Sequence, residues 1–435
     1  MEAQNSVMLG LGEPNISRPS RWLAVVDTVE RLYQDPDIDG LQIVCAAVAA
    51  HALKDYPPAW CLIIAPPGSM KTDVLESFRG LPGAHFVDEV TPKTFISGKI
   101  DEPGKKGKRK APASLLHRIG SDGFLIAADF STFSSNTKTL GAIVSQLRRI
   151  YDGNFSREFG SEENLDERSW TGRLTLLAGG TPDVDKHYQL FQSLGERFLR
   201  VRWNRAGGTD TGLRAMQHDR SVAVQLKAVM HDLLQPILSA PQDAPTIHPA
   251  ILRRIAALSE FIALARSYVE RDRFTREQTG ITVTEGNTRL PQQLAQIARG
   301  LALLDGRTEV TDEDYRLVVR AAFDSLLPTR AVVLKRIAQT GKPYTVEANH
   351  AAIERAIGDL QAAGVLGKNG RLSEQAKVLL EDACLDANSF VFNTGGGSAT
   401  PTSPRVVIGG CRNCGTFLDS LPTAQAPKGG SHECV

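Results

Sequence analysis

The sequence predicts an α/β fold, with a parallel sheet in the first half of the chain and helices in the second half. Short apolar runs bounded by turn residues indicate buried strands, and they alternate with segments of helical periodicity. These runs are 60–64, 85–87, 124–128, 173–178 and 198–203. From 209 to 323 the chain has the amphipathic period of helices alone. Strands that alternate with helices are typical of a parallel sheet.

Length and composition describe a soluble globular protein. The 435 residues are enough for two or three domains, and the net charge of +1 gives no overall indication of nucleic acid binding. The N-terminus lacks the basic-then-apolar layout of a secretory signal. The longest apolar stretch, 41–53, contains Gln42 and His51 and is too short to span a bilayer. We therefore expect a cytoplasmic protein with no membrane partner.

The stretch 60–79 carries the strongest functional pattern. An apolar run is followed by a small-residue loop, by Lys71-Thr72, and by a segment with Val74, Leu75 and Phe78 at helical spacing. Strand, small-residue loop, Lys-Thr and helix is the layout of a phosphate-binding loop. The alternative is a Pro-Gly turn before a helix that begins with Lys-Thr by coincidence.

Each part of this loop has an expected task toward a nucleotide. Backbone N–H groups would point at the phosphates, where the start of the helix adds partial positive charge. Lys71 would reach the β and γ phosphates, and the Thr72 hydroxyl would ligate Mg²⁺. The expected binding residues are Pro67, Gly68, Ser69, Met70, Lys71 and Thr72.

Two loop positions depart from the usual pattern. Ala65 and Met70 stand where the pattern has glycine. Alanine costs little where φ is negative. We expect Met70 to avoid the left-handed region, so that its backbone follows a slightly different path.

Two later strands end in polar residues that would lie at the same sheet edge. Asp129 follows the run 124–128, where it would hold Mg²⁺ through water. Thr181 follows the run 173–178 after Gly179-Gly180 and would orient a water near the γ-phosphate. A helix over 140–150 and a polar excursion over 151–171, read as a hairpin, lie between them.

A basic run lies in a loop between the second and third strands. Such a run is most often solvated, and contact with a phosphate backbone is the alternative. The candidate DNA-contacting residues are Lys105, Lys106, Lys108, Arg109 and Lys110.

Helices also flank the sheet segment on both sides. Residues 1–19 are polar and expected to be mobile, and Ser20 would cap a first helix ahead of the one at 41–53. In the second half, helices are expected over 222–238, 251–268 and 289–304, and Thr311 would cap another that runs to 322.

Residues 324–386 predict a winged-helix-like domain. Pro328 stands at a helix start, two helices follow, and Asn369-Gly370 between two short β segments indicates a hairpin. The presumed recognition helix carries Arg355 but also Glu354 and Asp359, so DNA reading and protein docking both stay open.

The C-terminal tail, 406–435, follows a flexible linker over 387–405. Two cysteines at CxxC spacing with a distal His and Cys predict a tetrahedral Zn²⁺ site, and a metal would explain how so short a tail folds. A disordered tail with free thiols is the alternative. The four ligands would be Cys411, Cys414, His432 and Cys434.

The order of these elements resembles an AAA+ ATPase, and in detail it is similar to bacterial and phage ATPases distantly related to the minichromosome maintenance helicases. The resemblance covers about 20–325, and implies a P-loop nucleotide-binding core over 20–205 with a helical lid over 206–323. It is carried by the segments 60–72, 91–98, 129–132, 150–153, 179–182, 194–198 and 288–290.

The resemblance implies ATP with Mg²⁺ and a role for each matching residue. Lys71 and Thr72 match Walker A, Asp129 the Walker B aspartate, and Thr181 sensor 1. An ATPase that acts on DNA in mobile-element or phage replication is the implied function. Phe130 stands where most such enzymes have the glutamate that polarises the attacking water.

Two arginines match the family's catalytic arginines. Arg197 resembles the arginine finger, and Arg289 the sensor 2 arginine of the lid; such groups stabilise charge on the γ-phosphoryl oxygens. An arginine finger that acts in trans requires self-association, usually as a ring. The alternatives are a salt bridge from Arg197 to Glu196 or a nearby acid, and an Arg289 without catalytic duty.

The missing glutamate leaves the activity open. Asp88 or Glu89, just past the second strand, are the substitutes that the sequence offers. One alternative function is a nucleotide-gated assembly or regulatory factor with little hydrolysis. Another is a DNA-binding regulator in which the winged helix and the tail do the work.

Overall fold

The structure is a computed structural model that describes residues 21–97, 114–130, 137–161, 164–193, 195–203, 207–272, 275, 278–280, 282–343 and 349–385. Four expectations lie outside these residues: the mobile N-terminus, the basic run, the flexible linker over 387–405 and the zinc-binding tail.

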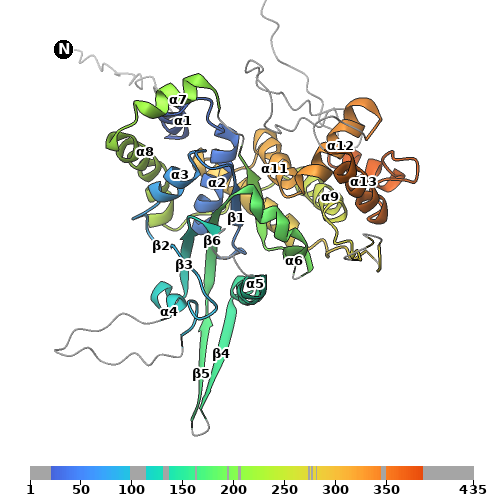
Figure 1. The fold of residues 1–435 in the computed structure, drawn as a ribbon. Helices are drawn as coiled ribbons and strands as arrows, with labels where there is room; N and C mark the ends of the chain where they lie inside the picture. Colours follow the sequence, from blue (N-terminus) through green and yellow to red (C-terminus); the bar gives the residue numbers. More distant parts are fainter. Residues whose placement is uncertain are drawn as a thin grey trace, which may run out of the picture.

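A five-stranded parallel sheet forms the centre of the protein (Figure 1). Its order is β2-β3-β6-β1-β7. The strands are β1 (Trp60–Ile64), β2 (Ala84–Val87), β3 (Asp122–Ala127), β6 (Arg173–Gly180) and β7 (Phe198–Arg202). The predicted α/β class and the parallel sheet are therefore confirmed.

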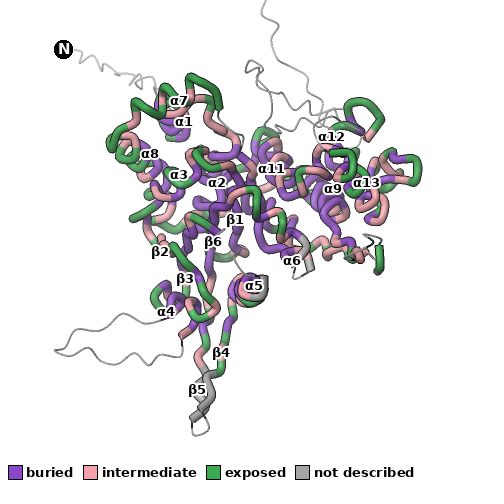
Figure 2. Tube along the Cα trace, viewed as in Figure 1, coloured by how far each residue is buried: buried purple, intermediate pink, exposed green. Residues whose placement is uncertain are grey.

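Helices cover both faces of this sheet, so successive side chains of β1 enter different cores. Cys61 and Ile63 belong to one hydrophobic cluster, and Trp60, Leu62 and Ile64 to the other. The first face carries α1 (Arg21–Leu32), α2 (Ile38–Ala49), η1 (Ala50–Ala52), α3 (Lys71–Ser77) and α8 (Arg220–Ser239). The second face carries α4 (Leu115–Ile119), α5 (Thr137–Tyr151), η3 (Pro182–His187) and α6 (Tyr188–Ser193). Figure 2 shows the buried residues concentrated in α2, β1 and β6.

The shared strand direction decides which residues can meet. Lys71, Asp129 and Thr181 follow β1, β3 and β6, so all three lie at the carboxyl edge of the sheet. Trp60 pairs with Phe198, which places Arg197 at the opposite edge. A strand of five residues separates the two edges by about 13 Å.

The polar excursion after α5 is an antiparallel hairpin, as predicted. Strands β4 (Asn154–Ser161) and β5 (Asn164–Thr171) pair along their whole length and project away from the sheet (Figure 1). At its base the Trp170 indole donates to the Gly120 carbonyl, with 2.6 Å between nitrogen and oxygen.

The second half of the chain is helical, as predicted, and shares a core with the first helices. The same cluster extends from Trp22 to Leu385. Thr311 and Asp314 form a capping box at the start of α11. The helices are α7 (Thr209–Met216), α9 (Pro249–Ala265), α10 (Arg289–Leu304) and α11 (Asp312–Asp324).

The region predicted to be a winged helix contains three helices and one isolated bridge, Leu366 to Leu372, in place of a regular hairpin. This region packs on the preceding helices. One contact between them is a hydrogen bond at 2.7 Å from the hydroxyl of Tyr315, in α11, to the Ala383 carbonyl. The helices are α12 (Pro328–Thr340), α13 (His350–Ala362) and α14 (Glu374–Asp382).

Within the described part of the chain, no helix is both long and apolar enough to cross a bilayer.

Candidate functional site

The loop between β1 and α3 turns through two left-handed residues. Gly68 has φ of 76° and Met70 has φ of 63°. The prediction that Met70 avoids this region is wrong, because the chain must reverse within a few residues to start α3 at Lys71. Methionine is not β-branched, so the conformation costs only about 1–2 kcal/mol. The Ser69 hydroxyl donates to the Pro66 carbonyl at 2.6 Å and the Met70 carbonyl accepts from Val74, which holds the turn.

Lys71 is a nine-tenths buried cation at the carboxyl edge of the sheet. Its exposed fraction is 9%, and its Nζ donates to the Gly180 carbonyl at 3.1 Å. Burial lowers the pKa of the Lys71 ammonium, and the charge of Asp129 opposes part of that effect. The structure therefore brings Lys71 and Asp129 together, as expected from strand direction.

Gly179 makes room for this arrangement. A β-carbon at that position would lie 2.5 Å from the Ala128 carbonyl oxygen and 3.2 Å from Cδ of Lys71. Only glycine allows β3 and the Lys71 stem to approach β6 so closely.

The other two predicted residues lie at the same edge. Thr72 is exposed on the first turn of α3, and Thr181 directly follows the carbonyl that Lys71 binds. Asp129 is also exposed. A hydroxyl and a carboxylate are oxygen donors that suit Mg²⁺ bound largely through phosphates and water. Among the described residues no three His, Cys, Asp or Glu side chains cluster as a metal site.

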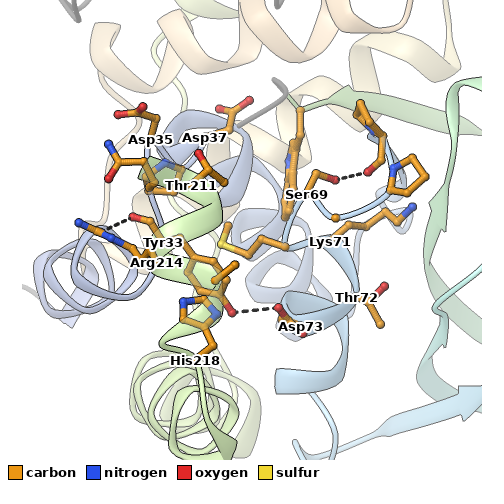
Figure 3. Close-up of a pocket in the computed structure, with 18 residues that line it drawn as sticks. Tyr33, Asp35, Asp37, Ser69, Lys71, Thr72, Asp73, Thr211, Arg214 and His218 are labelled. Atoms are coloured by element: carbon orange, nitrogen blue, oxygen red, sulfur yellow. Dashed lines mark hydrogen bonds between the residues drawn. The ribbon is translucent and has the colours of Figure 1, made fainter. Parts of the chain in front are cut away.

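A cavity of about 350 Å³ opens beside the loop (Figure 3). Residues 66–73 line one side of it. The other side is lined by the turn after α1, by Trp203 directly after β7, and by α7 with the residues that follow it; none of these was predicted as a site residue. They are Tyr33, Gln34, Asp35, Pro36, Asp37, Trp203, Thr211, Arg214, Ala215 and His218.

Side chains of this second wall bind each other and the loop helix. The Tyr33 hydroxyl donates to Asp73 at 3.0 Å, and the His218 ring meets the Tyr33 ring edge-on at 5.3 Å. Burial and the Asp73 carboxylate both raise the pKa of Tyr33, so the phenol stays protonated and keeps donating. Figure 3 shows Asp73 turned toward Tyr33, while Lys71 lies on the other side of the loop.

Helix α7 is attached to the end of α1 through polar contacts. Arg214 donates to the carbonyls of Glu30 at 2.7 Å and Tyr33 at 2.8 Å. His218 lies 2.6 Å from the Leu32 carbonyl. Helix ends leave such carbonyls without partners inside the helix, so α7 completes the hydrogen bonding of α1.

Arg197 and Arg289 lie together at the opposite edge of the sheet from Lys71. Arg197 is 7% exposed and forms an ion pair with Asp152 at 3.5 Å. The alternative considered from the sequence was a salt bridge from Arg197 to Glu196 or a nearby acid, and the nearby acid is Asp152, because Glu196 pairs with Arg200 at 2.9 Å. Arg289 donates to the Glu196 carbonyl at 3.2 Å.

A second cavity, of about 480 Å³, lies beside these arginines. Its lining includes Tyr151, Asp152, Arg173, Arg289 and Gln292. This cavity and the one at Lys71 therefore occupy different edges of the sheet.

The residue after Asp129 belongs to the core. Phe130 is 1% exposed, and its ring lies 6.1 Å from that of Phe191 and 5.7 Å from that of Phe198. Asp88 and Glu89 are exposed just past β2, the strand beside β3. They are therefore carboxylates at the same sheet edge as Asp129.

Comparison with known proteins finds no family model that matches the sequence and no curated protein with significant similarity to it. The functional argument therefore depends on the chemistry of the site.

Proposed function

We propose that the protein binds a nucleoside triphosphate, ATP in the first place, together with Mg²⁺ at the carboxyl edge of the sheet. The observation that carries this proposal is the buried cation Lys71, which lines a 350 Å³ cavity and feels the charge of Asp129 at the same sheet edge. A buried cation is costly unless a counter-charge is supplied, and phosphate oxygens supply it. Ligands prefer the carboxyl ends of strands in open parallel sheets.

The two sides of the cavity suit different parts of a nucleotide. Lys71 and Thr72 would hold the phosphates, and Asp129 would hold Mg²⁺ through water. The aromatic wall of Tyr33, Trp203 and His218 offers rings and an apolar surface for the base. When bound, the metal would supply positive charge at the β and γ phosphates.

Hydrolysis would require a second copy of the chain. Arg197 and Arg289 lie at the far sheet edge from the Lys71 of their own copy. Their guanidinium groups would serve the γ-phosphate of a neighbour, as expected for a ring. Thr181 would orient the attacking water, and Asp88 or Glu89 would polarise it.

A second candidate function is a nucleotide-gated assembly or regulatory factor with little hydrolysis. The observation that favours it is the burial of Phe130 in the core, since no carboxylate follows Asp129 directly. If neither Asp88→Asn nor Glu89→Gln changed the rate of phosphate release from ATP, that result would favour a nucleotide-gated factor with little hydrolysis.

Helix α13 is the element on which a proposal of action on DNA depends. On α13, Arg355 is exposed, but Asp359 binds Arg271 and Arg330 and faces the protein. DNA-stimulated turnover that Arg355→Ala reduces would support a motor or remodelling ATPase over the switch. Salt-dependent DNA binding without ATP would favour the DNA-binding regulator.

Phosphate release from ATP tests the proposal directly. Lys71→Ala and Asp129→Asn should each lower turnover at least about 100-fold, because both act on the charge of the transferred phosphoryl group. The exposed Lys368→Ala should match wild type. Turnover that survives Lys71→Ala would place the activity elsewhere.

A further inference from the structure

The cluster around Arg197 holds more positive charge than its surroundings balance. Burial lowers the pKa of the Arg197 guanidinium, and the like charges of Arg289 and Arg148 lower it further. In the part of the chain that the structure describes, one carboxylate, Asp152, faces this group, and it is 49% exposed. Within the described residues, the Nε atoms of both Arg148 and Arg197 are buried without a hydrogen-bond partner. Donors left unpaired in this way are costly and favour an anionic partner.

The position of Arg197 keeps it from reaching such a partner. Its side chain is 7% exposed, and Nη1 donates to the Gly195 carbonyl at 2.9 Å. Gly195 has φ of 82°, and a β-carbon there would lie 2.7 Å from that Nη1. The loop before β7 is therefore folded back tightly onto the arginine that it carries.

The bond from Arg197 to Asp152 is a weak restraint. Its length, 3.5 Å, exceeds the 2.7–2.9 Å that is usual for charge-assisted bonds, and the carboxylate is half exposed to solvent. A phosphate, with more charge and more acceptor oxygens, would compete well against it.

We propose that Asp152 holds Arg197 in a withdrawn position within a single copy, and that the phosphates of a nucleotide on a second copy draw the arginine away. This inference rests on the proposed function. Asp152 is a positioning residue: it restrains Arg197 and touches no substrate. The exchange would connect subunit contact to activity, because the arginine is available only after the Asp152 bond breaks.

The test compares wild type, Asp152→Asn, Arg197→Ala and the double variant, with ATP turnover and oligomer mass measured against protein concentration. Asp152→Asn should lower the protein concentration for half-maximal turnover and assembly by about two- to fivefold. This change corresponds to the free energy that an exposed ion pair contributes. In the Arg197→Ala background the same change should have no effect. Asp152→Glu, which keeps the charge, should behave as wild type.

Two results would overturn this role. One is an Asp152→Asn effect that persists without Arg197, which would make Asp152 a structural residue. The other is a loss of turnover in Asp152→Asn that occurs only when Arg197 is present, which would mean that Asp152 supports the active position of Arg197. Failure of the proposed function would be seen separately, as wild-type turnover that is absent or that Lys71→Ala leaves unchanged. In that case no bound phosphate would be available to Arg197.

Discussion

At the scale of single residues, Met70 shows where the sequence pattern was informative and where it failed. The pattern located the loop, but the absence of glycine suggested a different backbone. The structure keeps the left-handed turn and places a partly buried methionine in it, packed against the core. The preference of methionine for negative φ was outweighed by the need for the chain to turn directly into α3. No feature of the sequence shows which of these two effects is larger.

This explanation makes a prediction about the side chain at position 70. Met70→Ile, which adds a β-branch in the left-handed region, should destabilise the loop by about 1–2 kcal/mol and weaken ATP binding about five- to thirtyfold. Met70→Gly should bind within about threefold of wild type, because glycine adopts this conformation freely. Equal affinity of the isoleucine variant, by titration calorimetry, would show that the turn carries no strain.

The buried charge of Lys71 should be visible in the pH dependence of stability. Burial lowers the pKa of the folded state, so the unfolded chain holds the proton more tightly. Without nucleotide, the free energy of unfolding should therefore rise with pH between the lowered pKa and the usual value near 10.5.

Chemical denaturation of wild type and Lys71→Met across this interval measures the effect. Methionine removes the buried charge, so the free energy of unfolding of the variant should lack this rise with pH. The stability of wild type should therefore increase relative to that of Lys71→Met as pH rises. A constant difference between the two proteins would show that Lys71 is not destabilised by burial.

At the scale of elements, burial decided what could be predicted. β1 and α10 were predicted within a residue of their bounds, because each carries an apolar pattern that the core requires. Helix α7 lies in the stretch predicted to be helical from residue 209, but it has no buried residue, so no core position distinguishes it within that stretch. Its place beside the cavity depends on Arg214 and, just after the helix, His218, which contact the end of α1 only after folding. No local pattern could have found that wall.

The attachment of α7 can be tested through Arg214. Arg214→Ala removes donors to the carbonyls at the end of α1, and it should lower stability by about 1–2 kcal/mol. It should also weaken ATP binding, since α7 forms one wall of the cavity. Thermal melts and titration with ATP measure both effects, and the exposed Arg253→Ala is the control. Unchanged affinity would remove α7 from the binding site.

At the scale of the whole molecule, strand direction separates the site residues into two groups. Lys71, Asp129 and Thr181 share one edge, while Arg197 and Arg289 share the other. The sequence listed all five, but only the sheet register shows that the last two face away from the first three. The winged-helix region remains a prediction, because one isolated bridge stands where a hairpin was expected.

This separation predicts complementation between inactive copies. Lys71→Ala and Arg197→Ala should each be inactive alone, and an equimolar mixture should recover about a quarter of the wild-type rate, because one interface in four would pair an intact lysine with an intact arginine. Mixed-subunit turnover assays measure this recovery. A mixture as inactive as its components would show that Arg197 does not act between copies.

The most direct test of the central claim is the thermal stability of wild type and Lys71→Met with and without ATP and Mg²⁺. Binding to the folded state alone must raise the melting temperature of wild type. The account predicts that the methionine variant is at least as stable as wild type without nucleotide and gains almost nothing from ATP. An equal ATP-dependent rise in both proteins would contradict it, because the triphosphate would then be bound without the buried lysine.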